Sequence, residues 1–203
     1  MESKNRSKIL VIVSRIPENI EIASVYPKER DDEIARCKNS RVRCEKYFVW
    51  EILRRAAEQY TGIPFEALNI TKNQNGKWVS DKMCFSLSHS SSLVAVAVAN
   101  TSVGVDVEEI RKHIDGIERN IMTESELSYI YGLTAADAEQ EIIKIWTAKE
   151  SIFKSLDKPR FNPRGISVDE YSVKTDVILS DGKKYALSVS AERLDDVEYM
   201  FDL

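Results

Sequence analysis

Two stretches of the sequence contain acidic side chains whose spacing suits a metal cation. Residues 103–108 read Val-Gly-Val-Asp-Val-Glu, and in a strand Asp106 and Glu108 project from the same face because side chains alternate with a period of two. Glu150, in the second stretch, would supply a third carboxylate. Oxygen ligands suit a hard cation, and Mg2+ usually takes a few carboxylates together with water and substrate phosphates. These three residues are therefore candidate magnesium ligands if the fold brings them together.

The second stretch, residues 145–154, is predicted to be helical because the region 133–158 contains neither glycine nor proline. Trp146, Glu150 and Lys154 follow one another at intervals of four residues, so they share one face of the helix. The alternative is an ordinary surface ion pair, which stabilises a helix by only about 0.3–0.5 kcal/mol. A chemical role therefore requires that the strand at 103–108 packs against this face.

A single histidine, His89, lies in the polar segment 88–92, which reads Ser-His-Ser-Ser-Ser and is predicted to be a loop. An imidazole there could donate to a phosphate oxygen or act as a base, since its unperturbed pKa is about 6.5. The alternative is a structural hydrogen-bonding group. The motifs Gly-x-Ser-x-Gly, Gly-x-x-x-x-Gly-Lys-Ser/Thr and Gly-x-Gly-x-x-Gly do not occur. Their absence disfavours serine hydrolases, P-loop NTPases and dinucleotide-binding enzymes.

The overall composition indicates a globular protein of one domain or two small lobes, with 203 residues of which 43% are hydrophobic. Its longest apolar run, 93–99, is far shorter than the roughly 20 residues of a membrane-spanning helix. The three cysteines form no close metal-binding pair, which favours free thiols and a reducing, cytoplasmic location.

The net charge of −4 argues against nucleic acid as a partner. Residues 28–55 nevertheless contain nine lysines and arginines, which could form a positive surface for a small polyphosphate or an acidic protein. The alternative is an ordinary solvated helix face.

The hydrophobic pattern predicts a mixed α+β protein. Strands are predicted at 8–14, 83–87, 93–99 and 103–108, a hairpin around the turn at 73–76, one long or two shorter helices over 32–60, and a long helix over about 135–156. Thr123 and Glu126 have the spacing of a capping box, which predicts a short helix after them. The alternation in 172–203 predicts three antiparallel strands.

Three motifs, in this order and spacing, resemble those of the 4'-phosphopantetheinyl transferases. They are Phe-Ser-Leu-Ser-His-Ser at 85–90, Gly-Val-Asp-Val-Glu at 104–108 and Trp-Thr-Ala-Lys-Glu-Ser-Ile-Phe-Lys at 146–154. The length is similar to that of the longer, surfactin-synthetase-activating (Sfp-like) type. The resemblance implies a pseudo-dimer of two similar α+β lobes in one chain, here 1–101 and 102–203, with the active site between them. It also implies that the protein works as a monomer.

The resemblance implies Mg2+-dependent transfer of the phosphopantetheine arm of coenzyme A to a serine of an apo acyl or peptidyl carrier protein. The second product would be adenosine 3',5'-bisphosphate. Asp106, Glu108 and Glu150 would hold Mg2+ against the pyrophosphate. Glu150 is the first candidate for the base that accepts the serine proton and Glu108 the second, while Lys154 would bind the departing phosphate.

Further residues would bind coenzyme A in this comparison. Ser88 and His89 correspond to ligands of the adenosine-side phosphates. Lys77, after Gly76, matches a Gly-Lys-Pro element that contacts the nucleotide, although Trp78 replaces the proline. The basic contacts near the first long helix would be Lys46, Lys28 and Arg41.

Other functions remain as alternatives to transfer. One is a non-catalytic module that binds a carrier protein or a nucleotide. Another is a Mg2+-dependent pyrophosphatase that uses the same carboxylates. In the transferase interpretation, an acidic helix of the carrier would dock on exposed apolar residues between 114 and 131, inside a basic rim.

Overall fold

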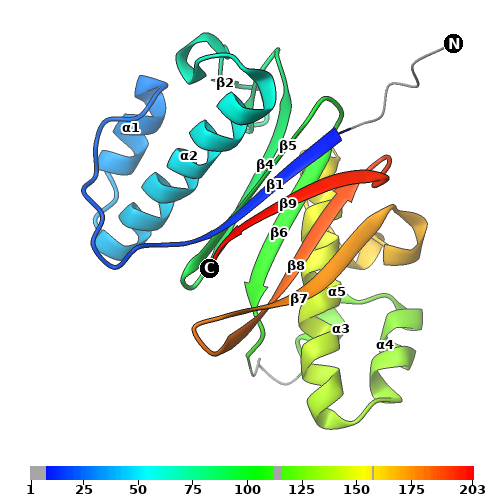
Figure 1. Cartoon of the computed structure of the whole chain (residues 1–203). Coiled ribbons are helices and arrows are strands. Elements are labelled where there is room, and N and C mark those ends of the chain that lie inside the picture. Colours follow the sequence, from blue (N-terminus) through cyan, green and yellow to red (C-terminus); the bar gives the residue numbers. More distant parts are fainter. Residues whose placement is uncertain (1–7, 112–115, 157) are drawn as a thin grey trace, which may run out of the picture.

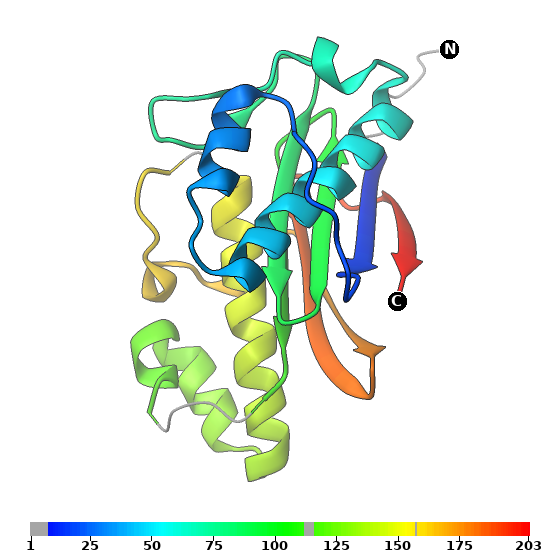
Figure 2. The ribbon, with the colours of Figure 1, turned by 90° about the vertical axis from the view of Figure 1, so that its left-hand side faces the viewer.

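Two β-sheets lie against each other between helices in the computed structural model, which describes residues 8–111, 116–156 and 158–203 (Figure 1). The first sheet has the strand order β4-β5-β1-β9 and the second has the order β6-β8-β7. Helices α1 and α2 lie outside the first sheet, and α5 covers the outer face of the second (Figures 1 and 2).

The elements of the first half are β1 (Lys8–Arg15), α1 (Lys28–Ala35), α2 (Ser40–Thr61), η1 (Phe65–Ala67), β2 (Thr71–Lys72), β3 (Trp78–Val79), β4 (Cys84–Ser90) and β5 (Leu93–Ala99). Those of the second half are β6 (Val103–Glu109), α3 (Glu118–Ile121), α4 (Glu124–Tyr131), α5 (Ala135–Ser155), η2 (Pro163–Gly165), η3 (Val168–Glu170), β7 (Val173–Ser180), β8 (Lys183–Ala191) and β9 (Asp196–Asp202). The mixed α+β class, the hairpin and the long helix predicted over about 135–156 are confirmed.

Strand β1 is buried on both faces, which explains its uninterrupted run of branched apolar residues. Leu10 and Ile12 belong to a core under α2, whereas Ile9 and Val11 belong to the core between the two sheets. The helical region predicted over 32–60 is divided into two helices, because α1 ends at Ala35 and α2 begins at Ser40. The two-helix alternative for 32–60 is therefore the correct one.

The last strand departs from the prediction for the C-terminal segment. Strands β7 and β8 pair antiparallel as predicted, but β9 leaves their sheet and pairs parallel with β1, where Ile9 lies opposite Val197 and Val13 opposite Phe201. The prediction of three consecutive antiparallel strands was therefore wrong for β9. This pairing satisfies main-chain donors and acceptors of β1, which could not find water in a buried strand.

The polar segment at 88–92 was also predicted incorrectly as a loop. Strand β4 continues to Ser90, and the turn to β5 begins only at Ser91, whose φ of 54° is in the left-handed region. His89 therefore lies on a strand, and its neighbours Ser88 and Ser90 point to the opposite face.

Candidate active site

The strand and the helix predicted to form the site do meet. Gly104 of β6 packs so closely on α5 that an added Cβ would lie 1.8 Å from the main-chain oxygen of Ser151. One turn further along α5, Lys154 donates a hydrogen bond of 2.6 Å to Oδ1 of Asp106 and one of 3.3 Å to the main-chain oxygen of Val105. A glycine in β6 thus allows the close approach that brings the ammonium to the carboxylate.

The three candidate carboxylates lie in one electrostatic environment. Burial raises the pKa of Glu108 and that of Glu150, and the negative charge of Asp106 raises both further. Glu108 also raises the pKa of Glu150, while the ammonium of Lys154 lowers both. Burial and mutual repulsion therefore disfavour negative charge on Glu108 and Glu150, and Lys154, together with Arg111 at Glu108, offsets part of this effect.

The donor atoms suit a hard divalent cation, although they are not arranged as a complete metal cage. Within the described ranges, no group of three or more His, Cys, Asp or Glu side chains is positioned to hold a metal ion. Oδ2 of Asp106 is buried and has no hydrogen-bond partner among the described residues. Because a buried carboxylate oxygen without a partner is costly, a cation beside Oδ2 would satisfy it.

Two serines of β4 bind the carboxylates of β6. The hydroxyl of Ser88 donates to Oδ1 of Asp106 at 2.7 Å, and that of Ser90 donates to Oε2 of Glu108 at 2.7 Å. The role of Ser88 as a phosphate ligand stays a prediction, since its proton is used by Asp106 in this structure. The contact of Ser90 was not predicted, although a serine at every second position from 86 to 90 was a visible signal.

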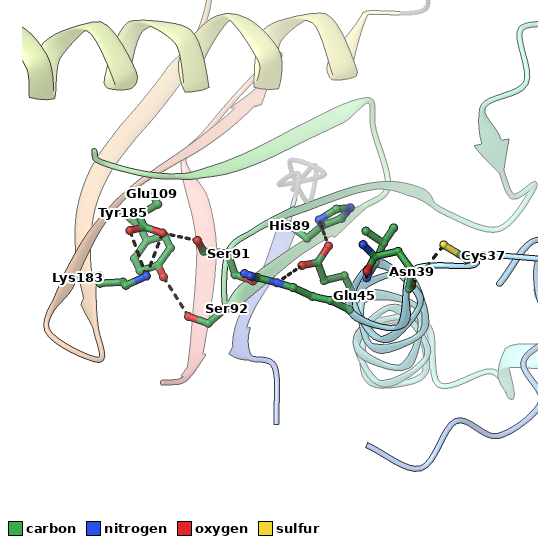
Figure 3. Close-up of polar contacts among 11 residues, drawn as sticks. Cys37, Asn39, Glu45, His89, Ser91, Ser92, Glu109, Lys183 and Tyr185 are labelled. Carbon is green, nitrogen blue, oxygen red and sulfur yellow. Dashed lines mark hydrogen bonds and ion pairs between the residues drawn. The ribbon is translucent and has the colours of Figure 1, made fainter. Parts of the chain in front are cut away.

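His89 points to the other face of β4, toward α2 (Figure 3). Its Nδ1 lies 3.7 Å from Oε2 of Glu45, whose Oε1 accepts a hydrogen bond of 3.1 Å from Arg41. Burial lowers the pKa of His89, Glu45 raises it, and the positive charges of Lys154, Arg30 and Lys46 lower it. The lysine of α5 and the basic residues of α1 and α2 thus act on the same imidazole.

The predicted basic contacts differ in how they are placed. Lys46 is half-buried and close enough to His89 to affect its pKa, whereas Lys28 and Arg41 are exposed. Arg41 reaches the main-chain oxygen of Ser91 at 3.4 Å, at the turn that follows His89. Arg30, which sequence reasoning did not select, stacks on Trp50 with 4.9 Å between its guanidinium carbon and the ring centroid.

The same turn also contacts the second sheet, as Figure 3 shows. Ser91 donates to Oε2 of Glu109, which also lies 3.3 Å from the ammonium of Lys183, and the hydroxyls of Ser92 and Tyr185 lie 3.0 Å apart. The β4–β5 turn therefore joins α2 on one side to β6 and β8 on the other.

A pocket of about 360 Å³ lies beside Lys154, between the β2–β3 hairpin and the end of α5. Its lining includes Gly76, Lys77, Trp78, Phe85, Phe153 and Lys154. Lys77 donates to the main-chain oxygen of Lys154 at 2.8 Å, so it lies beside the end of α5, and its contact with the nucleotide stays a prediction. Trp78 packs edge-on against Trp50 at 5.3 Å between ring centroids, which explains how this position accommodates an indole.

Lys149 shares its motif with Glu150 but turns away from the site. It is fully buried, forms an ion pair of 2.6 Å with Glu126, and donates to the main-chain oxygens of Ile121 and Pro163. Glu126 also completes the predicted capping box with Thr123, which is confirmed. Lys149 therefore connects α5 to the start of α4.

Sequence comparisons relate the chain to known proteins of one kind. Residues 102–197 match the sequence model of the 4'-phosphopantetheinyl transferase superfamily. The 4'-phosphopantetheinyl transferase gsp of Aneurinibacillus migulanus is 26% identical over 170 residues, which cover 83% of this chain and 71% of the relative. The 4'-phosphopantetheinyl transferase psf-1 of Bacillus pumilus is 27% identical over 110 residues, which cover 53% of this chain and 47% of that relative.

Residues 102–197 are therefore a domain of the 4'-phosphopantetheinyl transferase superfamily, and the two relatives confirm the resemblance of the chain to transferases of this type that was seen in the three motifs. Both relatives are named for the transfer of a 4'-phosphopantetheinyl group. In the part of the chain that the structure describes, no helix has the length and apolar character needed to cross a membrane.

Proposed function

We propose that the protein transfers the 4'-phosphopantetheine group of coenzyme A to a serine hydroxyl of an apo acyl or peptidyl carrier protein. The reaction requires Mg2+ and releases adenosine 3',5'-bisphosphate. The observation that supports it most strongly is the contact of 2.6 Å between Lys154 and Asp106, because it joins the two motifs at one point next to the pocket.

The proposed step is a displacement at the β-phosphorus of coenzyme A. The serine oxygen forms a bond to this phosphorus, its proton passes to Glu150 or, as second candidate, to Glu108, and the bond to the bridging oxygen of adenosine bisphosphate breaks. The raised pKa of Glu150 supports this role, since a carboxylate with a higher pKa accepts a proton more readily. Lys154 binds the departing phosphate, where negative charge develops.

Asp106, Glu108 and Glu150 would hold Mg2+ through their oxygen atoms. When bound, this cation neutralises charge on the pyrophosphate oxygens. Coenzyme A binds with its nucleotide toward Lys77 and with its adenosine-side phosphates toward His89, Ser88, Lys46, Arg41 and Lys28. The positive charges that lower the pKa of His89 support a phosphate-binding region at this place.

The carrier protein docks beside the N-terminal half of α5 in this proposal. Ile117, Tyr129 and Tyr131 are exposed there, and the two tyrosines have exposed fractions of 54% and 58%. Arg119 supplies positive charge there, since it donates a hydrogen bond of 3.2 Å to the hydroxyl of Tyr131. Ile114, at the start of the predicted docking region, lies outside the described residues.

The architecture we propose is a pseudo-dimer that works as a monomer, with lobes 1–101 and 102–203 and the reaction between them. In support, each half provides strands and one long helix on the outer face of its sheet (Figure 1). Strand β9 is shared, since it belongs to the second lobe by sequence and to the first sheet by pairing. Three free cysteines support a reducing, cytoplasmic location.

One assay tests the proposal. The protein is incubated with coenzyme A, Mg2+ and an apo carrier protein, and the intact carrier is weighed by mass spectrometry. A gain of one phosphopantetheine on the carrier, absent when the carrier serine is changed to alanine, is the expected result. Cleavage of coenzyme A without this gain would indicate a pyrophosphatase, and no reaction with any of a panel of apo carriers would indicate a binding module.

A further inference from the structure

The two sheets meet at a seam between β4 and β6 that is closed by serine side chains instead of main-chain pairing. The strands belong to different sheets, yet the hydroxyl oxygens of three alternate serines of β4 accept hydrogen bonds from main-chain N–H groups of β6. The pairs are Ser86 with Val105 at 3.0 Å, Ser88 with Val107 at 3.2 Å and Ser90 with Glu109 at 3.1 Å. Each pair is 19 residues apart, so the register is constant along the seam.

The three serines differ in the acceptor to which the hydroxyl donates a hydrogen bond. A hydroxyl has one proton and two lone pairs, so a serine that accepts an N–H can still donate once. Ser88 donates to Oδ1 of Asp106 and Ser90 donates to Oε2 of Glu108, both at 2.7 Å. Ser86 makes only the contact with the N–H of Val105 among the described residues.

We propose that Ser88 and Ser90 are positioning residues for the cation site, because each hydroxyl occupies one oxygen of a carboxylate and directs the other oxygen toward the cation. This inference rests on the proposed function, which places Mg2+ at Asp106 and Glu108. It is supported by the arrangement at Asp106, where Oδ1 has both Ser88 and Lys154 as partners while the buried Oδ2 has none among the described residues.

The hydrogen bonds of the seam hold the hydroxyls of Ser88 and Ser90 in place relative to the carboxylates. The serine oxygen is fixed by an N–H of the strand that carries the carboxylate, so hydroxyl and carboxylate keep their relative position even if the sheets shift slightly. Hydrogen bonds to ligating carboxylates orient them, and loss of such partners typically weakens metal binding about 10- to 100-fold. Ser86 is a matched control, since it lies in the same seam and binds no carboxylate.

The experiment measures binding of Mn2+, a spectroscopic substitute for Mg2+, to the full-length protein without coenzyme A or carrier. Free Mn2+ is followed by electron paramagnetic resonance for the wild type and for Ser88→Ala, Ser90→Ala and Ser86→Ala. The expected result is a dissociation constant about 10-fold or more higher for the first two variants. Ser86→Ala should stay within about twofold, and Ser90→Thr, which keeps the hydroxyl, should bind like the wild type.

Equal affinities of Ser90→Ala and Ser86→Ala would overturn the inference, and so would failure of the wild type to bind Mn2+. Thermal melts check folding, and the half-buried Ser90 remains a test if the buried Ser88 does not tolerate alanine. Transfer activity is assayed separately. If the protein transfers phosphopantetheine but the serine variants bind Mn2+ like the wild type, the proposed function stands and the inference about the serines is wrong. If the serine variants bind Mn2+ more weakly but the protein transfers nothing, the inference stands and the proposed function is wrong.

Discussion

The ammonium nitrogen of Lys154 lies 2.6 Å from Oδ1 of Asp106, so α5 and β6 form an ion pair at the centre of the candidate site. The side chain of Lys154 is 26% exposed and that of Asp106 is 4% exposed. The carboxylate is therefore almost fully removed from water, whereas the ammonium is still partly in contact with water. Lys154 therefore stabilises Asp106 in the resting protein, and in the proposed reaction its partly exposed ammonium would also bind the departing phosphate.

Replacement of Lys154 by alanine should reduce kcat by about 100-fold or more, with a smaller change in the dissociation constant of coenzyme A. The reason is that the charge on the departing phosphate grows in the transition state, where a fixed ammonium has its largest effect. Steady-state kinetics and calorimetric binding measure the two quantities. Lys144→Ala, on the same helix but paired with Glu141, is the control. Weaker binding of coenzyme A with an unchanged kcat would mean that Lys154 contributes to ground-state binding only.

Replacement of Glu150 by glutamine should lower turnover by at least about 100-fold and leave the fold intact. The melting temperature without added metal should not fall, because burial, Asp106 and Glu108 together disfavour the charge of Glu150 more than Lys154 favours it. Activity assays and thermal melts in EDTA test both parts. Substantial residual activity would exclude Glu150 from the roles of base and metal ligand together.

The local structure of the site could be predicted because it depends on short-range patterns. Alternation with valines places Asp106 and Glu108 on one face of β6, and spacing of four residues places Glu150 and Lys154 on one face of α5. The contact between β6 and α5 is part of the tertiary structure, and in the sequence only the resemblance to a family suggested it.

Features that depend on partners distant in the sequence were missed. The segment at 88–92 reads as a polar loop, but its serines find N–H and carboxylate partners on β6 and therefore extend a strand. Lys149 lies in the motif at 146–154, but its buried contacts with Glu126 and with the main-chain oxygens of Ile121 and Pro163 give no signal in the sequence. No local signal distinguishes the parallel pairing of β9 with β1 from a third antiparallel strand.

Gly104→Ala should destabilise the protein by at least about 2 kcal/mol, since the added Cβ would overlap the main-chain oxygen of Ser151 and α5 cannot yield as a flexible side chain would. Moving α5 from β6 should also separate Lys154 from Asp106 and reduce transfer. Urea denaturation and the carrier assay measure these effects. Gly132→Ala, where the nearest atom to the added Cβ is at 3.4 Å, is the control and should change stability by less than about 1 kcal/mol. Comparable stability of the two variants would contradict the close packing at Gly104.

His89 should make the protein less stable as the pH falls. Burial lowers its pKa below the ordinary value of about 6.5, so between these two values the unfolded chain binds more protons than the folded protein. The contribution of His89 is therefore fully present above about pH 6.5 and is lost as the pH falls toward the folded pKa. Urea denaturation of the wild type and His89→Gln at pH 7.5 and 5.5 should show that the wild type loses more stability. The same loss in both proteins would show that His89 titrates normally.

Lys149 and Glu126 should be energetically coupled, because the lysine is fully buried and the carboxylate nearly so. Removing one member of a buried ion pair leaves an uncompensated charge, so Lys149→Met should cost about 3–5 kcal/mol. In the double variant with Glu126→Gln no charge remains and the amide can still accept from the N–H of Thr123, so the loss should be smaller than for Lys149→Met alone. A double-mutant cycle by urea denaturation measures the coupling, and Arg193→Met, which breaks the exposed pair with Asp195, should change stability by less than about 1 kcal/mol. Additive effects would show that Glu126 does not stabilise the buried ammonium, and α4 would then not be anchored to α5 through this pair.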